Sequence, residues 1–315
     1  MLLPILLCST RSFDAALRDI QSRVSTLGSV RAAVEAQVGT LDAAFLPTLQ
    51  ARLDEEPTDE LWEVMDAMGE IFSMPELMRV TEGDEIIARH WNADNLGEYW
   101  ELDDDEQLAV DLDGLPADSA RPAENERGSG YGEVTRAGGR TLFRVMGLSA
   151  SAKQPVARPV FVDLGSGAGR LVAQAWFELA PAAIIERAIG VELASSRHEA
   201  AVRAWASVRA AGDAPSLADG AEPQFLRGSL LDVDLTDATH VYVASLLMRD
   251  DLLDKLWARL RDPAQTPRLA VVASLREFRA ADADGVVSEV HQVAMNWNEA
   301  CRVYVYRIAA NRELS

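Results

Sequence analysis

A glycine-rich turn between a predicted strand and a predicted helix carries the residue types of a nucleotide-cofactor site. Residues 160–164 form a β-branched and aromatic run that contains Asp163; alternating glycines follow at 165–169, and then a helical pattern over 170–179. Glycines at such a turn let the backbone approach a ligand without an intervening Cβ. The next predicted strand carries Glu192, at about the 20-residue spacing at which carboxylates bind ribose hydroxyls in such folds.

The spacing of these glycines distinguishes two kinds of cofactor. Dinucleotide-binding turns need G-x-G-x-x-G, whereas Arg170 stands at the third glycine position here. The compact G-x-G-x-G form favours a ligand without phosphates, such as S-adenosyl-L-methionine, and Asp163 would then face its cationic amino and sulfonium end. An ordinary strand–helix junction is the alternative explanation of the glycines alone. The cofactor-binding residues predicted from this region are Asp163, Gly165, Ser166, Gly167, Gly169 and Glu192.

The charge balance limits the classes of partner. The chain of 315 residues has 50 acidic and 30 basic residues, a formal net charge of −20. Such a surface repels nucleic acid and anionic membranes, so we expect neither direct nucleic-acid binding nor membrane association. A basic protein, in contrast, would be attracted.

Cysteine and histidine usage gives little support for a metal site or a disulfide framework. The cysteines, Cys8 and Cys301, and the four histidines are scattered along the chain, and we expect the histidines at or near the surface. The apolar run 2–7 is too short to span a bilayer and lacks the features of a signal peptide. We therefore expect an intracellular protein, cytoplasmic or nuclear, with a mitochondrial location left open.

The N-terminal part is first helical and then acidic. Apolar residues recur at helical spacing from about residue 12 to 75, which predicts a packed helical subdomain. Residues 90–120 contain ten acidic residues and no lysine or arginine, which favours a solvated, mobile linker over a docking surface for a basic protein. The predicted organisation is a helical region with an acidic linker over 1–127 and a second domain over 128–315.

From residue 160 onward, predicted strands and helices alternate, which is typical of a parallel, doubly wound sheet. Two strand-like runs joined by a short turn end the pattern and predict an antiparallel hairpin, where a dehydrogenase would continue with another crossover. The predicted fold is α/β, a Rossmann-like seven-stranded mostly parallel sheet with a C-terminal antiparallel hairpin, preceded by an α-helical N-terminal region. We expect strands at 160–164, 188–193, 224–228, 240–246, 269–275, 286–295 and 302–308, and helices at 170–179, 195–211 and 250–261.

A short loop upstream of the glycine turn adds a family resemblance. Residues 131–135, Tyr-Gly-Glu-Val-Thr, resemble the Tyr-Gly-Glu-x-Thr loop of the disruptor-of-telomeric-silencing family of histone lysine methyltransferases. Residues 162–169 and 190–192 are similar to that family's first and second motifs, and 228–231 lies where its adenine-contacting segment would be. The resemblance covers roughly residues 128–278 and implies a class I S-adenosylmethionine-dependent methyltransferase.

The same core is similar to a second family, the lysine methyltransferases of the mitochondrial ATP synthase c-subunit. The shared features are the Asp-Leu-Gly-Ser-Gly-x-Gly-Arg run and residues 234–238. The histone enzymes carry Asn-Asn-Phe after the fourth strand, where this chain has Ala-Ser-Leu-Leu-Met at 244–248, and they hold nucleosomal DNA with a basic segment that this acidic sequence does not have. These departures count against a nucleosomal histone as the acceptor.

The resemblance implies roles for individual residues. Tyr131 would be a catalytic lid residue over the methionyl end of the cofactor, and Thr135 would hydrogen-bond the amino or carboxylate group there. Ser229 and Leu230 would flank adenine. Ser245, at the mouth of the fourth strand, would be a second catalytic residue facing the crevice where ligands bind in open parallel sheets.

Methyl transfer to lysine needs a neutral, well-placed amine more than acid–base catalysis. A dry, aromatic-lined channel lowers the pKa of the acceptor lysine; Phe278 and Trp297 are candidates for its wall, although such residues more often belong to a core or a surface. We therefore predict a protein-lysine N-methyltransferase of the histone-lysine type that uses S-adenosyl-L-methionine. Its expected substrate is a lysine-containing protein, and a basic protein is compatible with the acidic chain. The alternatives are a small-molecule methyltransferase, in which the N-terminal helices would close the pocket as a lid, and a non-catalytic cofactor-binding protein with the same fold.

Overall fold

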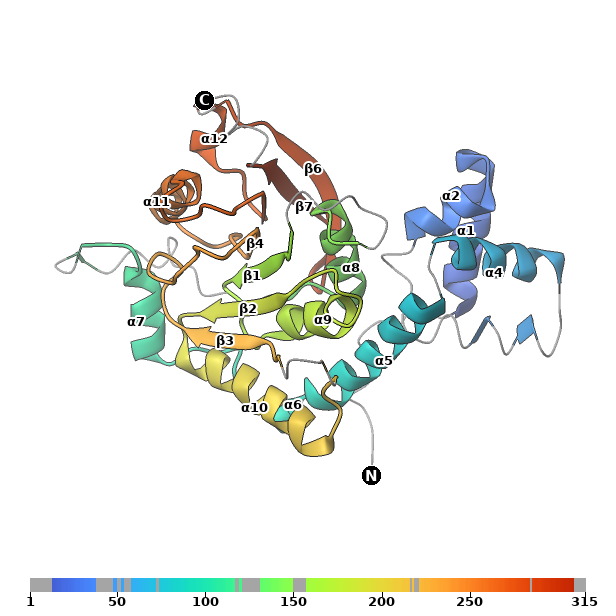
Figure 1. The fold of residues 1–315 in the computed structure, drawn as a ribbon, viewed down its shortest axis with the longest axis horizontal. Helices are drawn as coiled ribbons and strands as arrows, with labels where there is room; N and C mark the ends of the chain where they lie inside the picture. The colour runs from blue at the N-terminus through green and yellow to red at the C-terminus, as the bar shows by residue number, and fades with distance from the viewer. Residues whose placement is uncertain are drawn as a thin grey trace.

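A mixed seven-stranded sheet organises the computed structural model, as Figure 1 shows. The structure describes residues 13–37, 48–49, 52–53, 58–71, 74–116, 119–120, 131–149, 157–215, 217, 221–283 and 285–308. The strand order is β3-β2-β1-β4-β5-β7-β6. The strands are β1 (Val160–Leu164), β2 (Arg187–Glu192), β3 (Gln224–Arg227), β4 (His240–Val243), β5 (Val271–Ser274), β6 (Ser288–Met295) and β7 (Asn298–Arg307).

The strand directions confirm the predicted fold class. β1 to β5 pair in parallel, whereas β7 is antiparallel to both β5 and β6. The hairpin is tighter than expected, because Met295 already pairs with Asn298 and only Asn296 and Trp297 form the turn. β7 therefore begins four residues before the predicted 302, since the exposed residues 298–300, Asn-Glu-Ala, continue the strand.

Both faces of β1, β2, β4 and β5 are buried, whereas the edge strand β3 is mostly exposed. Alternate side chains of the buried strands enter two different cores. On one face Phe161 and Ala188 pack with α8 (Arg136–Val145), α9 (Arg170–Leu179) and α10 (Ser195–Ala211). On the other face Val162 and Val241 pack with α11 (Asp250–Arg261) and α12 (Arg279–Ala283). The bounds of α9, α10 and α11 match the predicted ranges.

Three N-terminal helices have an apolar core of their own. They are α1 (Phe13–Leu27), α2 (Val30–Gln37) and α4 (Asp59–Ile71), whose buried side chains include Ile20, Val34 and Val64. Figure 1 shows this group beside the sheet domain, joined to it through α5 (Met74–His90). The predicted helical N-terminal region is thus confirmed, while the proposed domain boundary at 127/128 lies outside the described residues. No helix in the described part of the chain has the length and apolar composition needed to cross a bilayer.

The acidic segment is not a mobile linker over its described residues, and this expectation is wrong. Residues 91–116, which we call the strap, include α6 (Ala93–Leu96) and α7 (Asp104–Leu112) and bury Trp91, Leu96 and Tyr99 in the core below the sheet. The prediction considered only the charged residues of this segment. The apolar side chains between them provide the packing that holds it against the sheet domain.

Part of the acidity of the strap is used at helix N-termini. The Asp103 carboxylate accepts a hydrogen bond from the Glu106 amide at 2.8 Å and caps α7. The Glu106 carboxylate accepts from the Ser196 amide at 2.5 Å and from the Ser195 hydroxyl at 2.8 Å, at the start of α10. Carboxylates are stabilising at such positions, because helix N-termini present unpaired amides.

Two histidines expected near the surface are buried instead. His90 is 3% exposed and bridges α5 and α10, with Nδ1 at 2.9 Å from the Ser207 hydroxyl and Nε2 at 2.7 Å from Asp213. His240 is fully buried in β4, where burial and then the nearby Arg307 lower its pKa to about 4. Both rings serve packing between elements.

A buried ion cluster ties α5 to the sheet domain and gives a stability prediction. The Arg140 guanidinium of α8 contacts Asp84 of α5 at 2.5 Å and Glu178 of α9 at 2.8 Å, and all three are nearly inaccessible. Arg140→Met should lower the free energy of unfolding by about 3–5 kcal/mol, because Glu178 stays buried without its cation and Asp84 keeps only Arg136, at 3.8 Å. Urea denaturation of Arg140→Met and of Arg144→Met, a more exposed arginine of the same helix, measures this. Equal losses in the two variants would contradict it.

Candidate functional site

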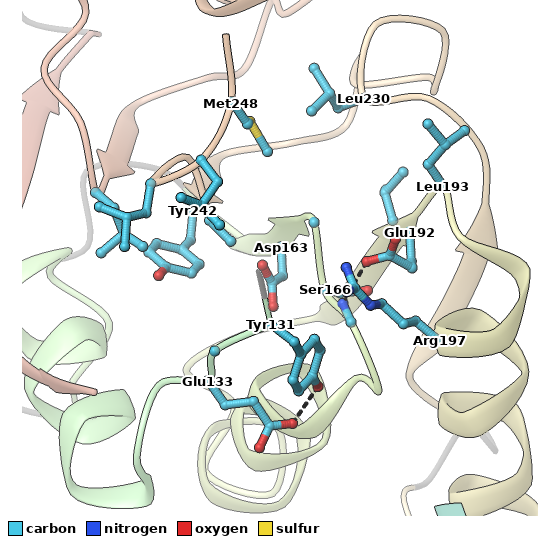
Figure 2. Close-up of a pocket in the computed structure, with 18 of the residues that line it drawn as sticks. Tyr131, Glu133, Asp163, Ser166, Glu192, Leu193, Arg197, Leu230, Tyr242 and Met248 are labelled. Atoms are coloured by element: carbon cyan, nitrogen blue, oxygen red, sulfur yellow. Dashed lines mark hydrogen bonds between the residues drawn. The ribbon is translucent and has the colours of Figure 1, made fainter. Parts of the chain in front are cut away.

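A cavity of about 330 Å³ opens at the carboxyl edge of the sheet. It lies beside β1 at the switch point, where the chain passes to β2 on one side and to β4 on the other, the usual ligand position in open α/β sheets. Its walls come from the turn after β1, the ends of β2 and β4, the loop after β3, the loop at residues 131–134, the end of α7 and the hairpin turn. Figure 2 shows the side chains that converge on it.

The glycine turn forms the floor of this cavity. The amides of Gly165 and Ser166 both donate to the Val191 carbonyl, at 2.9 and 3.0 Å, which joins the turn to β2. Gly167 has φ of +54°, and a Cβ there would lie 2.8 Å from the Tyr131 ring. Only glycine satisfies both constraints, so this glycine is required by the close approach of Tyr131.

Glu192 ends β2 with its carboxylate in the cavity wall. One oxygen accepts from the Gly167 amide and the other from the Ala194 amide, each at 2.9 Å. The Gly167 amide is therefore already paired with Glu192. Burial raises the pKa of Glu192, and these amides and Arg197 partly oppose the rise. Each carboxylate oxygen keeps a second lone pair for a hydroxyl donor such as a diol.

Asp163 has a carboxyl group without a matching donor. It is 3% exposed, it lines the cavity, and its Oδ1 has no hydrogen-bond partner in the structure. Burial, and then the charge of Glu192, raise its pKa to about 8. A buried carboxyl facing a cavity in this way is suited to a cationic ligand group, whose charge would replace the missing partner.

Tyr131 covers the glycine turn through a network that links three segments. Its hydroxyl donates to Glu133 at 2.5 Å, as Figure 2 shows. The same hydroxyl accepts from the Ala168 amide at 3.3 Å. Glu133 forms an ion pair with Arg170, which also donates to the carbonyl of Trp91 in the strap. The predicted lid residue is thus held in place from the strap side and from α9.

The structure brings seven of the predicted residues into the cavity wall and leaves four outside it. Thr135 instead caps α8, accepting from the Gly138 amide at 3.0 Å and donating to the Ala294 carbonyl at 3.0 Å. Gly169 precedes α9 and faces Phe225. The residues in the wall are Tyr131, Asp163, Gly165, Ser166, Gly167, Glu192 and Leu230; those outside are Thr135, Gly169, Ser229 and Ser245.

The predicted catalytic role of Ser245 is corrected by its position. Ser245 is fully buried, its hydroxyl lies 2.7 Å from the Ser274 hydroxyl, and it accepts from the Arg276 amide at 2.9 Å. β4 ends at Val243, before the predicted 246, so the chain has already left the sheet and this side chain turns toward β5. Ser245 joins two strands and does not touch the cavity.

Several cavity residues were missed because they come from segments distant in sequence. Tyr242 pairs with Asp163 in the sheet register and is buried beside it, and burial raises the pKa of its phenol. Arg197, from the first turn of α10, also lines the cavity, and its guanidinium lies 4.9 Å from the centroid of the Tyr131 ring. Tyr99 is not in the wall but supports it, because its ring meets the Tyr131 ring edge-on at 5.0 Å. Position on the strand beside Asp163 would have identified Tyr242; no local signal marks Arg197.

The two aromatic candidates for an acceptor wall separate clearly. Phe278 is 1% exposed and packs on Trp257 at 5.0 Å, so it belongs to the core on the α11 side. Trp297, in the hairpin turn, is 43% exposed and lines the cavity. Leu246 and Leu247, at 42% and 45% exposure, continue this apolar rim.

In the described residues no group of three or more potential metal ligands lies together.

Comparison with known proteins gives only distant likenesses. No protein-family profile and no curated protein sequence matches the chain. Among solved structures, an RNA methyltransferase from Salinibacter ruber in complex with S-adenosyl-L-homocysteine is 20% identical over 54% of this chain and 89% of that one, with a TM-score of 0.36.

Two further solved structures are similarly distant. A tRNA methyltransferase from B. subtilis is 14% identical over 54% of this chain and 64% of its own length, with a TM-score of 0.35. Geranyl diphosphate C-methyltransferase from Streptomyces coelicolor, in complex with S-adenosyl-L-homocysteine, is 13% identical over 68% and 97%, with a TM-score of 0.38. The fold of this chain therefore rests on its own strand order and register.

The raised pKa of Asp163 predicts a pH-dependent cost in stability. The protonated carboxyl is favoured in the folded state, so its contribution is full below the unfolded pKa of 3.8 and is lost as the pH rises through about 8. At pH 7–8 the free energy of unfolding of Asp163→Asn should exceed that of the parent by at least about 1 kcal/mol. This gain in stability should disappear near pH 4. Denaturation across pH, with the exposed Asp254→Asn as control, measures it; a pH-independent difference would refute the assignment.

Proposed function

We propose that this chain is an S-adenosylmethionine-dependent methyltransferase that acts on a lysine side chain of a protein. The observation that carries the proposal is the unpaired, buried carboxyl of Asp163 in a cavity that Glu192 and the glycine turn also line. A cation, a diol and a flat apolar group are the parts that such a cavity selects, and S-adenosyl-L-methionine contains all three.

The residues present fit this cofactor. Asp163 would hold the cationic amino group, and Glu192 would accept from the ribose hydroxyls with the lone pairs its amide contacts leave free. Leu193 and Leu230 supply apolar walls for adenine. The Salinibacter and Streptomyces structures contain S-adenosyl-L-homocysteine, the spent form of this cofactor, which is consistent with the proposal.

The chain's own residues contribute positioning and exclusion of water. The cofactor, when bound, supplies an electrophilic methyl group on its sulfonium centre. Tyr131, held by Glu133 and Arg170, covers the cavity and limits solvent access. The apolar rim of Leu246, Leu247 and Trp297 would lower the pKa of an entering lysine, because it disfavours the ammonium form. A neutral amine held in line with the methyl group is what the transfer requires.

The charge around the cavity supports a protein acceptor over a nucleic acid. Arg170 is paired with Glu133, Arg249 donates to two strap carbonyls, and Arg276 contacts Asp250. These arginines are already engaged, while phosphate contacts dominate nucleic-acid affinity. The resemblance of residues 131–135 and 162–169 to lysine methyltransferases supports lysine in particular.

One observation favours a small-molecule methyltransferase as a second candidate. Val110 and Asp113 at the end of α7 line the cavity, so part of the N-terminal region does cover it. Such a lid is what the small-molecule alternative predicted.

The proposal also includes the division of the chain into a helical N-terminal region and a catalytic domain over 128–315. The strap belongs to the N-terminal region in sequence, but it packs against the catalytic domain.

The identity of the acceptor can be tested by transfer of a tritiated methyl group. The purified chain, incubated with labelled S-adenosyl-L-methionine and a cell lysate, should label a protein band that survives nuclease treatment and yields methyl-lysine on acid hydrolysis. Label in a small-molecule fraction would support the second candidate instead. Label in RNA would contradict both, and no affinity for S-adenosyl-L-homocysteine would remove the cofactor assignment itself.

The role of Glu192 gives a separate prediction. Glu192→Ala should weaken S-adenosyl-L-homocysteine binding by about 1–3 kcal/mol, because the ribose hydroxyls lose their acceptor. Calorimetric titration measures it, with the exposed Glu199→Ala of α10 as a control that should bind like the parent. Unchanged affinity in Glu192→Ala would count against the site.

A further inference from the structure

One edge of the sheet is a long, regular strand. β6 is the outermost strand beyond β7, and Figure 1 shows it along the outer side of the sheet. Its eight residues include neither proline nor lysine, the residues that commonly block edge strands. The irregularity in its pairing with β7 lies beyond Val293. The opposite edge strand, β3, has only four residues and ends in Arg227, so β6 is the better template for an added strand.

The outward backbone groups of β6 belong to its even-numbered residues. The Ala294 carbonyl points away from β7, because it accepts from the Thr135 amide on the outer side of the strand. Backbone groups alternate in direction along a strand, so those of Ser288, Val290 and Gln292 point the same way. Within the part of the chain that the structure describes, no segment pairs with these three residues on that side.

The side chains of this edge are locally balanced in charge. Val290 is 55% exposed although it lies inside the strand. Glu289 and His291 flank it on the opposite face of the sheet. Arg307 of β7 donates to both carboxylate oxygens of Glu289, at 3.3 Å each, and so pairs the only acidic residue of β6. The net charge of −20 opposes self-association of the chain, and this edge contributes little to that repulsion.

We propose that two copies of this chain associate through β6, which pairs with itself antiparallel about a two-fold axis at Val290. The outward backbone groups of the two Val290 residues then bond to each other, and those of Ser288 bond to those of Gln292 in the other copy. The two valine side chains meet on one face of the joined sheet and bury apolar surface. One continuous sheet then crosses the dimer, and the two-fold axis closes the contact. This inference goes beyond the proposed function and does not depend on it.

The side chains select this register over its neighbours. With the axis at Val290, Glu289 of each copy lies opposite His291 of the other, so that an acceptor faces a donor. With the axis at Glu289, two carboxylates would lie face to face, which is destabilising. With the axis at His291, Glu289 would lie opposite the buried, apolar Val293. The strand is therefore complementary to itself in the register centred on Val290.

Disulfide trapping tests this register. Val290→Cys should form a covalent dimer under mild oxidation, because directly paired residues lie about 5.5 Å apart between their Cα atoms, within the reach of a disulfide. Gln292→Cys is the matched control, since its two copies would lie about 13 Å apart and should not cross-link. The parent protein reports any cross-link through Cys8 or Cys301. Equal cross-linking of the two variants, or none in Val290→Cys, overturns the inference.

Sedimentation equilibrium measures the association itself. A contact of this size should give a dimer with a dissociation constant of about 1–100 µM. Val290→Pro should weaken the dimer at least about tenfold, because it removes the outward N–H of each copy and leaves the bonds between β6 and β7 in place. Val290→Thr keeps that N–H and a branched side chain, and should still dimerise.

A parent protein that stays monomeric at about 100 µM overturns the inference, even if a strand of another protein proves to bind this edge. A Val290→Pro variant that associates like the parent overturns it as well. The cysteine variants introduce no proline, so the register is still tested if Val290→Pro does not fold.

Discussion

The two hydrogen bonds of the Glu192 carboxylate connect the parts of the site. Through Gly167 it holds the glycine turn after β1, and through Ala194 it holds the start of α10, so one buried side chain sets the distance between two strand ends. Tyr131 can then approach Gly167, and Arg197 of α10 can lie over the Tyr131 ring. The geometry of the cavity therefore depends on one buried carboxylate. Burying this charge is unfavourable, and the hydrogen bonds from the two amides offset that cost.

The acidic character of the chain has a structural explanation as well as an electrostatic one. In the strap, Asp103 and Glu106 occupy helix N-termini, where carboxylates pair with unpaired amides. Such groups are no longer free to repel one another, and they fasten α7 to α10. The same segment places Asp113 in the cavity wall, so a stretch whose composition suggests a solvated linker is joined to the site at both ends.

Predicted site residues that lie close together in sequence also lie together in the cavity wall. Asp163, Gly167 and Glu192 follow from one strand–turn–helix–strand unit, because local chain geometry determines where they lie. The failures have physical reasons. Ser245 was expected to face the cavity because it follows a strand end, but its side chain turns toward Ser274 instead. Thr135 was expected to bind the cofactor, but its hydroxyl caps its own helix by accepting from the Gly138 amide. Asp113 and Arg197 reach the cavity through packing between distant segments, which no local pattern encodes.

The strap is fastened to α11 through main-chain atoms. Arg249 and Lys255 donate to the carbonyls of Asp111, Asp113 and Gly114. Carbonyl acceptors are present whatever amino acid occupies a position, so mutational drift in the outward-facing residues of α7 leaves this anchorage intact. Among related chains the strap can therefore diverge in composition while keeping its course, provided that the two donors remain.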